Sequence, residues 1–187
     1  TQKMPWDPMR DYKWMWANTE HFMSLFRASK PVICKIHGLG AFAGGSDIAL
    51  CCDFVFMCDD SQIGYMPARV WGVPTTAMWV YRLGAEKAKR MLFTGDKISG
   101  TEAEKIGLIL KAVQKNHIDN EVEKFALRMT SVPINQLTMQ KLMINQAIEA
   151  SGLINTQRFA TIFDGMSRHT PEGLNFKKMS EEKGWKA

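Results

Sequence analysis

Apolar positions recur at two different periods along the chain, and the change of period separates predicted helices from predicted strands. Residues 11–29 carry an apolar stripe at helical spacing, which predicts an amphipathic helix. Residues 31–36 and 53–57 are short runs of branched and aromatic side chains, which favour buried strands. Between them, four glycines fall within residues 38–45. The pattern predicts a strand, a glycine-rich turn, a helix from about Ser46 and a returning strand, as in a βαβ unit.

The rest of the chain predicts a few more α/β elements and then helices alone. The predicted elements are a short strand over 62–65, a loop over 66–74, helices over 75–83 and 85–93 broken at Gly84, a strand over 108–113, and helices over 117–131, 134–150, 153–167 and 171–183. Ser99 and Glu102 have the spacing of a capping box, which predicts another helix start. We therefore expect an α/β core over residues 1–115 and a helical C-terminal region over 116–187.

Composition changes this picture mainly by exclusion. The chain is 45% apolar and 23% charged, and no apolar run reaches the roughly 18 residues of a membrane span. The four cysteines lack metal-ligand spacing, so we expect reduced cysteines, no metal site and a cytoplasmic protein. The net charge of +5 is modest and is explained either by solvated helix faces, which we favour, or by attraction for an anionic ligand. Without a basic stripe interleaved with aromatic residues, nucleic acid is not an expected partner.

The glycine-rich segment is the strongest candidate for chemistry. A helix that begins directly after it leaves unpaired N–H groups and a partial positive charge at its start. The glycines let a ligand approach the backbone, so this helix start can stabilise an oxyanion or bind a phosphate. Asp47 lies in the predicted first turn. It is either a proton-transfer group or a residue favoured there by the helix dipole alone.

An ordered series of motifs carries a resemblance to a known family. The motifs are Lys30-Pro31-Val32-Ile33, His37-Gly38, Ala43-Gly44-Gly45-Ser46-Asp47-Ile48-Ala49, Cys52-Asp53, Ser61-Gln62-Ile63-Gly64, Tyr81-Arg82-Leu83, Leu92-Phe93-Thr94-Gly95-Asp96-Lys97-Ile98-Ser99 and Ala103-Glu104-Lys105-Ile106-Gly107-Leu108. In this order they resemble the crotonase superfamily, the enoyl-CoA hydratase/isomerase family, over about residues 20–170. The resemblance implies a crotonase-like α/β core of ββα-type units with a helical C-terminal region that packs against other subunits in a homo-trimer or hexamer. It also implies a core that is incomplete at the N-terminus, because family members carry their first strands before the matched stretch.

The resemblance assigns roles to particular residues. Gly44 matches the glycine whose N–H stabilises the thioester oxyanion, and Asp47 matches the first catalytic carboxylate, usually a glutamate. The implied substrate-binding residues are Gly45, Met66, Pro67, Ala68 and Trp71. No cofactor is expected, apart from coenzyme A as part of the substrate.

The chain departs from the family pattern at the second catalytic carboxylate. In the family a glutamate follows the proline of this loop, whereas here Ala68 follows Pro67. The next family segment, small residues around Gly-Gly-Thr, is replaced by residues 75–79. The expected function is an acyl-CoA-processing, hydratase-like lyase of fatty acid metabolism that stabilises a thioester enolate. The alternatives are a CoA-thioester hydrolase or decarboxylase, and a non-catalytic acyl-CoA-binding or assembly subunit. The missing carboxylate favours both alternatives, and the intact glycine turn with Asp47 argues against the second.

Overall fold

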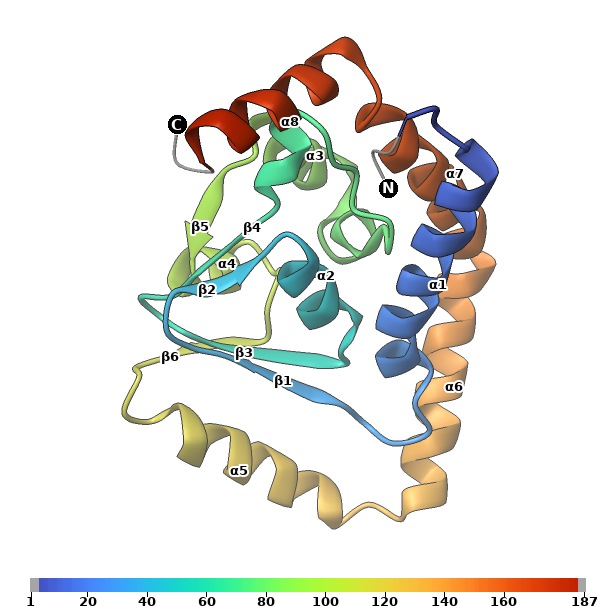
Figure 1. The fold of residues 1–187 in the computed structure, drawn as a ribbon. Helices are drawn as coiled ribbons and strands as arrows, with labels where there is room; N and C mark the ends of the chain where they lie inside the picture. Colours follow the sequence, from blue (N-terminus) through green and yellow to red (C-terminus); the bar gives the residue numbers. More distant parts are fainter. Residues whose placement is uncertain (1–3, 185–187) are drawn as a thin grey trace.

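The computed structural model describes residues 4–184. Two small stacked sheets form its centre, with helices on and beside them (Figure 1). The first sheet is parallel and has the order β1-β3-β6. In the second, of order β2-β4-β5, β4 runs parallel to β2 and antiparallel to β5. The strands are β1 (Ile33–Ile36), β2 (Gly40–Phe42), β3 (Phe54–Cys58), β4 (Gln62–Gly64), β5 (Lys97–Ser99) and β6 (Lys111–Val113).

The helices account for most of the remaining residues. They are α1 (Pro8–Arg27), α2 (Gly44–Cys51), the short 3₁₀ helix η1 (Met66–Arg69), α3 (Met78–Thr94), α4 (Gly100–Lys105), α5 (Ile118–Thr130), α6 (Ile134–Ala150), α7 (Leu153–Ser167) and α8 (Pro171–Lys183). The last three begin and end at the predicted residues. Local signals define these ends: Gly152, at φ +95°, separates α6 from α7, and Pro171 occupies the first turn of α8.

Side-chain caps explain several of the helix starts. The carboxylate of Asp7 accepts hydrogen bonds from the N–H groups of Met9 (3.1 Å) and Arg10 (3.0 Å) at the start of α1. Ser99 Oγ accepts from Glu102 N–H at 3.2 Å and so confirms the predicted start of α4. The reciprocal half of the capping box is replaced, because the Glu102 carboxylate pairs with Arg90 at 2.8 Å.

The glycine-rich segment was predicted to be a turn, but its structure is more regular. It contains β2, and α2 begins at Gly44 rather than near Ser46. Pairing of β2 with β4 requires glycine at position 40, where φ is +122° and a Cβ atom would lie 1.7 Å from the carbonyl oxygen of Gln62. A three-residue strand has too little pattern to distinguish it from a turn in sequence.

Several other predictions were wrong in detail. The helix predicted over 11–29 is Pro8–Arg27, and the strand predicted over 31–36 is Ile33–Ile36. The loop predicted over 66–74 contains η1, the helix predicted from 75 begins at Met78, and the strand predicted over 108–113 is confined to Lys111–Val113. Strand β5 was not predicted. The predicted break at Gly84 is confirmed, since its φ of +73° interrupts the helical geometry of α3.

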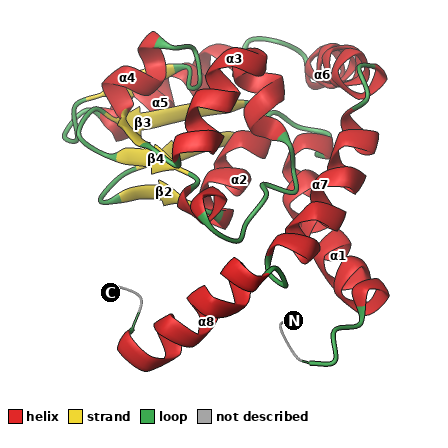
Figure 2. Cartoon of the chain, turned by 90° about the horizontal axis from the view of Figure 1, so that it is seen from above, coloured by secondary structure: helices red, strands yellow, loops and turns green. Residues whose placement is uncertain are grey.

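The core forms on both faces of the first sheet. On one face α2 packs between the sheet, α1 and α3, around buried residues such as Leu50, Met57 and Trp79. On the other, α5 covers the sheet, with the rings of Phe54 and Phe125 4.8 Å apart. Figure 2 shows α1, α6 and α7 beside the sheets, and α7 packs against α1. The division into residues 1–115 and 116–187 stays a prediction, but α7 reaches the part of the core that carries α2.

Candidate active site

The first turn of α2 presents backbone donors that have no partner among residues 4–184. Ser46 and Asp47 donate their N–H groups to the carbonyl of Ala43 (3.0 and 3.2 Å). Within residues 4–184, the N–H groups of Gly44 and Gly45 make no such hydrogen bond. A Cβ atom at Gly45 would meet no atom within 4 Å. Gly44, the predicted oxyanion donor, therefore has a first-turn N–H group, and the open space lies at its neighbour Gly45.

Backbone strain is concentrated around this helix start. Among the residues that the structure describes, the non-glycine residues with positive φ are Ala43 (50°) and Ala77 (57°). They flank the starts of α2 and α3. A side chain in this region of φ costs on the order of 1–3 kcal/mol, and such strain is typically found at functional sites. Asp47 follows the first strained alanine by one helical turn, and Thr76 directly precedes the second.

Asp47 is a buried carboxyl group, 3% exposed. Burial raises its pKa from the ordinary 3.8 to about 7. The Thr76 hydroxyl, which donates to Asp47 Oδ1 at 2.8 Å, opposes this rise, and the negative charge of Asp164 adds to it. A carboxyl group with a pKa near neutrality can both accept and return a proton at physiological pH.

A buried charged cluster between α1 and the C-terminal end of α7 was not predicted from the sequence. Asp164 Oδ2 accepts from Arg168 Nε at 3.1 Å, and Arg168 Nη2 donates to both carboxylate oxygens of Asp11 at 3.1 Å. The absence of a side chain at Gly165 lets Asp11 approach, because a Cβ atom there would lie 2.8 Å from its Oδ2. A lone carboxylate in the apolar stretch Phe163-Asp164-Gly165-Met166, four residues before an arginine, was the available signal.

The cluster connects α7 to the loop that follows η1. Asp164 Oδ1 accepts from the N–H of Val73 at 3.1 Å. Burial raises the pKa of Asp164. Burial also raises the pKa of the Tyr65 hydroxyl, and the charges of Asp47 and Asp164 raise it further. Asp47, Tyr65 and Asp164 thus share one low-dielectric region at the helix start.

The predicted substrate-binding residues other than Gly45 lie in η1 and the following loop. Met66, Pro67 and Ala68 form most of η1 and are half-buried. The carbonyl of Pro67 accepts three N–H groups of the following turn, at 2.9 to 3.1 Å. Trp71 stacks on Phe176 of α8, with ring centroids 6.2 Å apart. Their substrate contacts stay predictions, and no proton-transferring side chain stands at Ala68.

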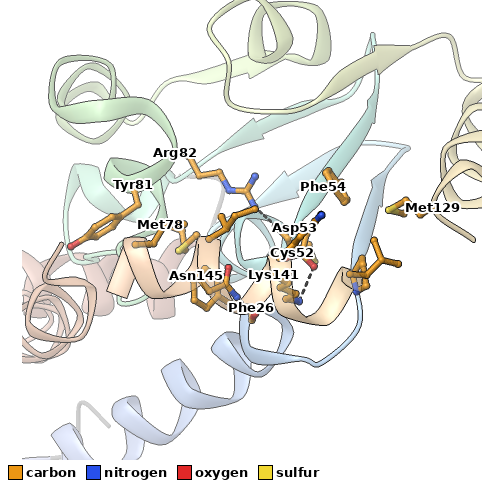
Figure 3. Close-up of a pocket in the computed structure, with 15 residues that line it drawn as sticks. Phe26, Cys52, Asp53, Phe54, Met78, Tyr81, Arg82, Met129, Lys141 and Asn145 are labelled. Carbon is orange, nitrogen blue, oxygen red and sulfur yellow. Dashed lines mark hydrogen bonds and ion pairs between the residues drawn. The ribbon is translucent and has the colours of Figure 1, made fainter. Parts of the chain in front are cut away.

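A cavity of about 320 Å³ lies at the opposite end of α2, lined by none of the predicted site residues (Figure 3). The charged side chains that line it, Asp53, Arg82 and Lys141, are bonded to other groups of the protein. Lys141 Nζ donates to Asp53 Oδ2 at 2.8 Å and to two backbone carbonyls. Arg82 donates to the carbonyls of Leu50 and Cys52, which end α2. The charged side chains that line this cavity are therefore explained by their bonds within the protein.

The described residues were also expected to lack a metal site, a membrane-spanning helix and disulfides. Within residues 4–184 no group of three or more His, Cys, Asp and Glu side chains could hold a metal ion. No helix in that range has the length and apolar character needed to cross a bilayer. All four cysteines are free thiols.

Comparison with known proteins decides the family. The model of the enoyl-CoA hydratase/isomerase family matches residues 3–180. The chain belongs to this family. It superposes on the crystal structure of an enoyl-CoA hydratase from Mycobacterium smegmatis with a TM-score of 0.93 at 44% identity, covering 99% of this chain and 63% of that one. The predicted crotonase fold is thereby confirmed.

Curated relatives within the enoyl-CoA hydratase/isomerase family are more distant. The crotonyl-CoA hydratase of Syntrophomonas wolfei is 33% identical over 124 residues, which cover 64% of this chain and 47% of the relative. The mitochondrial enoyl-CoA hydratase of Pongo abelii is 28% identical over 133 residues, covering 70% of this chain and 46% of the relative. The chain thus spans about half the length of the curated relatives that it matches.

Proposed function

We propose that this protein is an acyl-CoA-processing, hydratase-like lyase whose reaction passes through a thioester enolate. The observation that carries the proposal is the buried Asp47 carboxyl group, with a pKa raised to about 7. It lies one turn from the N–H groups of Gly44 and Gly45, which have no partner in the part of the chain that the structure describes. This combination offers proton transfer and oxyanion stabilisation at one helix start. The substrate class, the link to fatty acid metabolism and a cytoplasmic location are parts of the same proposal.

The N–H group of Gly44 is assigned to the thioester oxygen. When water adds to an enoyl thioester, negative charge develops on that oxygen. A fixed backbone donor stabilises this charge by about 3 kcal/mol, because it needs no reorientation. The net charge of +5 favours encounter with the anionic coenzyme A moiety.

Asp47 is assigned to proton transfer. As a carboxylate it takes a proton from water while the water oxygen bonds to C3 of the enoyl group. The electron pair of the double bond moves toward the thioester oxygen. The protonated Asp47 then returns the proton to C2 as the enolate collapses, so the product is a 3-hydroxyacyl thioester. One carboxyl group balances this reaction, consistent with the absence of a second carboxylate at Ala68.

Ligand binding tests the role of the backbone donors. We expect crotonyl-CoA to stabilise the protein against thermal unfolding by about 2.7 kcal/mol at about 100 times its dissociation constant. A thioether analogue of the same length, which lacks the carbonyl oxygen, should stabilise it distinctly less at equal concentration. Free coenzyme A serves as the control for binding through the nucleotide portion. Equal stabilisation by thioester and thioether would contradict the assignment to Gly44, and stabilisation by neither would remove the binding proposal.

A second candidate reaction follows from Ala68, which cannot move a proton. With one carboxyl group, Asp47, the same site could hydrolyse or decarboxylate a CoA thioester, and a protein without turnover would be an acyl-CoA-binding or assembly subunit. Product analysis separates these cases. A 3-hydroxyacyl-CoA formed from an enoyl-CoA would identify a hydratase. Free coenzyme A released from a saturated acyl-CoA would identify a hydrolase, and carbon dioxide released from a carboxyacyl-CoA would identify a decarboxylase.

An exposed apolar face on α7 leads us to propose a trimer or hexamer. Phe159, Ile162, Phe163 and Met166 are each more than 40% exposed. Ile162 and Met166 also line a groove of about 500 Å³ against α1. We expect Phe163→Glu to lower the molar mass measured by light scattering at micromolar concentration, because it places a charge on this face. Leu127→Glu, at an exposed apolar site on α5 (60% against 50% for Phe163), is the control and should leave the mass unchanged. Wild-type protein that is already monomeric would contradict the proposal.

A further inference from the structure

A hydrogen-bonded chain of two side chains leads from α7 to the Asp47 carboxyl group. Gln157 Nε2 on α7 donates to the carbonyl oxygen of Thr76 at 2.9 Å. The hydroxyl of Thr76 donates in turn to Asp47 Oδ1 at 2.8 Å. Gln157 and Thr76 are both fully buried. Solvent therefore does not compete with either bond, which makes both stronger than their surface equivalents.

The orientation of the Gln157 amide is fixed by its partner. A carbonyl oxygen accepts only from the amide nitrogen, so Nε2 must face Thr76. Within residues 4–184 the other amide atom, Oε1, has no hydrogen-bond partner although it is buried. A buried acceptor without a partner is costly, so the favourable contact of this side chain is the one to Thr76.

The backbone at Thr76 needs this support. The next residue, Ala77, adopts a φ of 57°, and its N–H bonds to the carbonyl of Pro74 at 3.1 Å. The bond from Gln157 to the Thr76 carbonyl holds the peptide group between Thr76 and this strained residue. The hydroxyl of Thr76 is thereby directed toward α2.

We propose that Gln157 and Thr76 act in series as positioning residues that orient the Asp47 carboxyl group and stabilise its anionic form. The inference rests on the proposed function for its catalytic consequence, but its physical content concerns Asp47 alone. Thr76 acts directly on the carboxyl group, and Gln157 acts only through Thr76. A threonine hydroxyl is the donor because it reaches Asp47 without adding a charge to the site.

The other groups near Asp47 act in the opposite direction or are uncharged. Burial and the negative charge of Asp164, from α7, favour the neutral carboxyl group. Tyr65, before η1, and Cys51, on α2 itself, interact electrostatically with Asp47 and are neutral near pH 7 because burial raises the pKa of each. From α1, the uncharged side chains of Phe22 and Met23 contact α2, and the charge of Arg27 interacts with Cys51. Thr76 is thus the side chain whose hydrogen bond favours the anion, in addition to the partial positive charge at the start of α2.

The test compares two adjacent buried threonines. Thr75 accepts a hydrogen bond from Thr19 at 2.6 Å and is not bonded to Asp47, so Thr75→Val is the matched control for Thr76→Val. The readout is the carboxyl ¹³C shift of Asp47 against pH in aspartate-labelled protein, assigned with Asp47→Asn. We expect Thr76→Val to raise the pKa of Asp47 by about one to two units, because the anion loses its donor. Thr76→Ser should keep the wild-type titration, and Thr75→Val should not move it.

The consequence for turnover has a specific pH signature. At pH 7, Thr76→Val should lower kcat/KM at least about 5-fold, since fewer Asp47 side chains are ionised, and the loss should disappear at alkaline pH. An unchanged Asp47 titration in Thr76→Val, or an equal shift in Thr75→Val, overturns the inference. Gln157→Met, which keeps the side-chain volume, must shift the titration in the same direction by less, and it decides the matter if Thr76→Val does not fold. Failure of the proposed function would appear separately, as wild-type protein that titrates as described but turns over no acyl-CoA.

Discussion

Asp47→Asn is expected to abolish most turnover while making the protein more stable above pH 7. Loss of the proton-transfer group should lower kcat about 10²–10⁴-fold. Asparagine keeps the shape of the side chain and an oxygen that can accept from Thr76, so acyl-CoA binding should be nearly unchanged.

The gain in stability follows from the direction of the pKa shift. The folded-state pKa of Asp47 is about 7, above the ordinary 3.8, so folding binds a proton between these values. The stability that this group contributes is fully present below about pH 4 and is lost as the pH rises through 7. Asparagine has no charge to bury, so Asp47→Asn should gain up to about 4 kcal/mol at pH 8 and little at pH 4.

Denaturant unfolding at both pH values, together with kcat, checks this prediction. Asp60→Asn, on the exposed surface, is the control and should change neither quantity appreciably. Full turnover in Asp47→Asn would make Asp47 a helix-start residue only. A stability difference that does not depend on pH would contradict the shifted pKa.

Arg168→Met is expected to be the most destabilising of the substitutions considered, by about 3–5 kcal/mol. Arg168, Asp11 and Asp164 have side chains at most 7% exposed. Removing the arginine would leave two buried carboxylates without their shared cation, and it would release the contacts between α1 and α7. Equilibrium unfolding in urea near neutral pH measures the effect.

The matched control is Arg90→Met, which breaks a surface ion pair to Glu102. The two side chains are 49% and 38% exposed, so the loss should stay below about 1 kcal/mol. If Arg168→Met cost no more than Arg90→Met, the cluster would not be a determinant of stability. Lower pH should reduce the cost of Arg168→Met, since burial raises the pKa of Asp164 and its protonated form needs no counter-charge.

Sequence reasoning succeeded where the determining signal was local. The ends of α6, α7 and α8 follow from glycine, proline and capping residues within a few positions of each end. The glycine-rich segment before a helix marked this region as a candidate site, and the family resemblance singled out Gly44 and Asp47, whose roles stay predictions.

The missed residues depend on contacts between distant parts of the chain. Thr76 lies 29 residues from Asp47, Gln157 lies 81 from Thr76, and Asp164 lies 91 from Val73. Nothing in the sequence spacing of these residues predicts that Gln157 and Asp164 of α7 will contact the segment around Thr76, next to the start of α2. The short strands β2 and β5 were missed because three residues carry no measurable period and form through pairing with β4.

Helix α7 has two faces with different contacts, and in the proposed assembly this would make it a route of communication between subunits. Its outer face carries Phe159 and Phe163, while its inner face carries Gln157, bonded to Thr76, and Asp164, bonded to Val73. A rotation of α7 imposed from outside would move both inner contacts together. In an assembly built on this helix, packing of one subunit would therefore tune the proton affinity of Asp47 in its neighbour, so that quaternary structure and catalytic pH response become one coupled property.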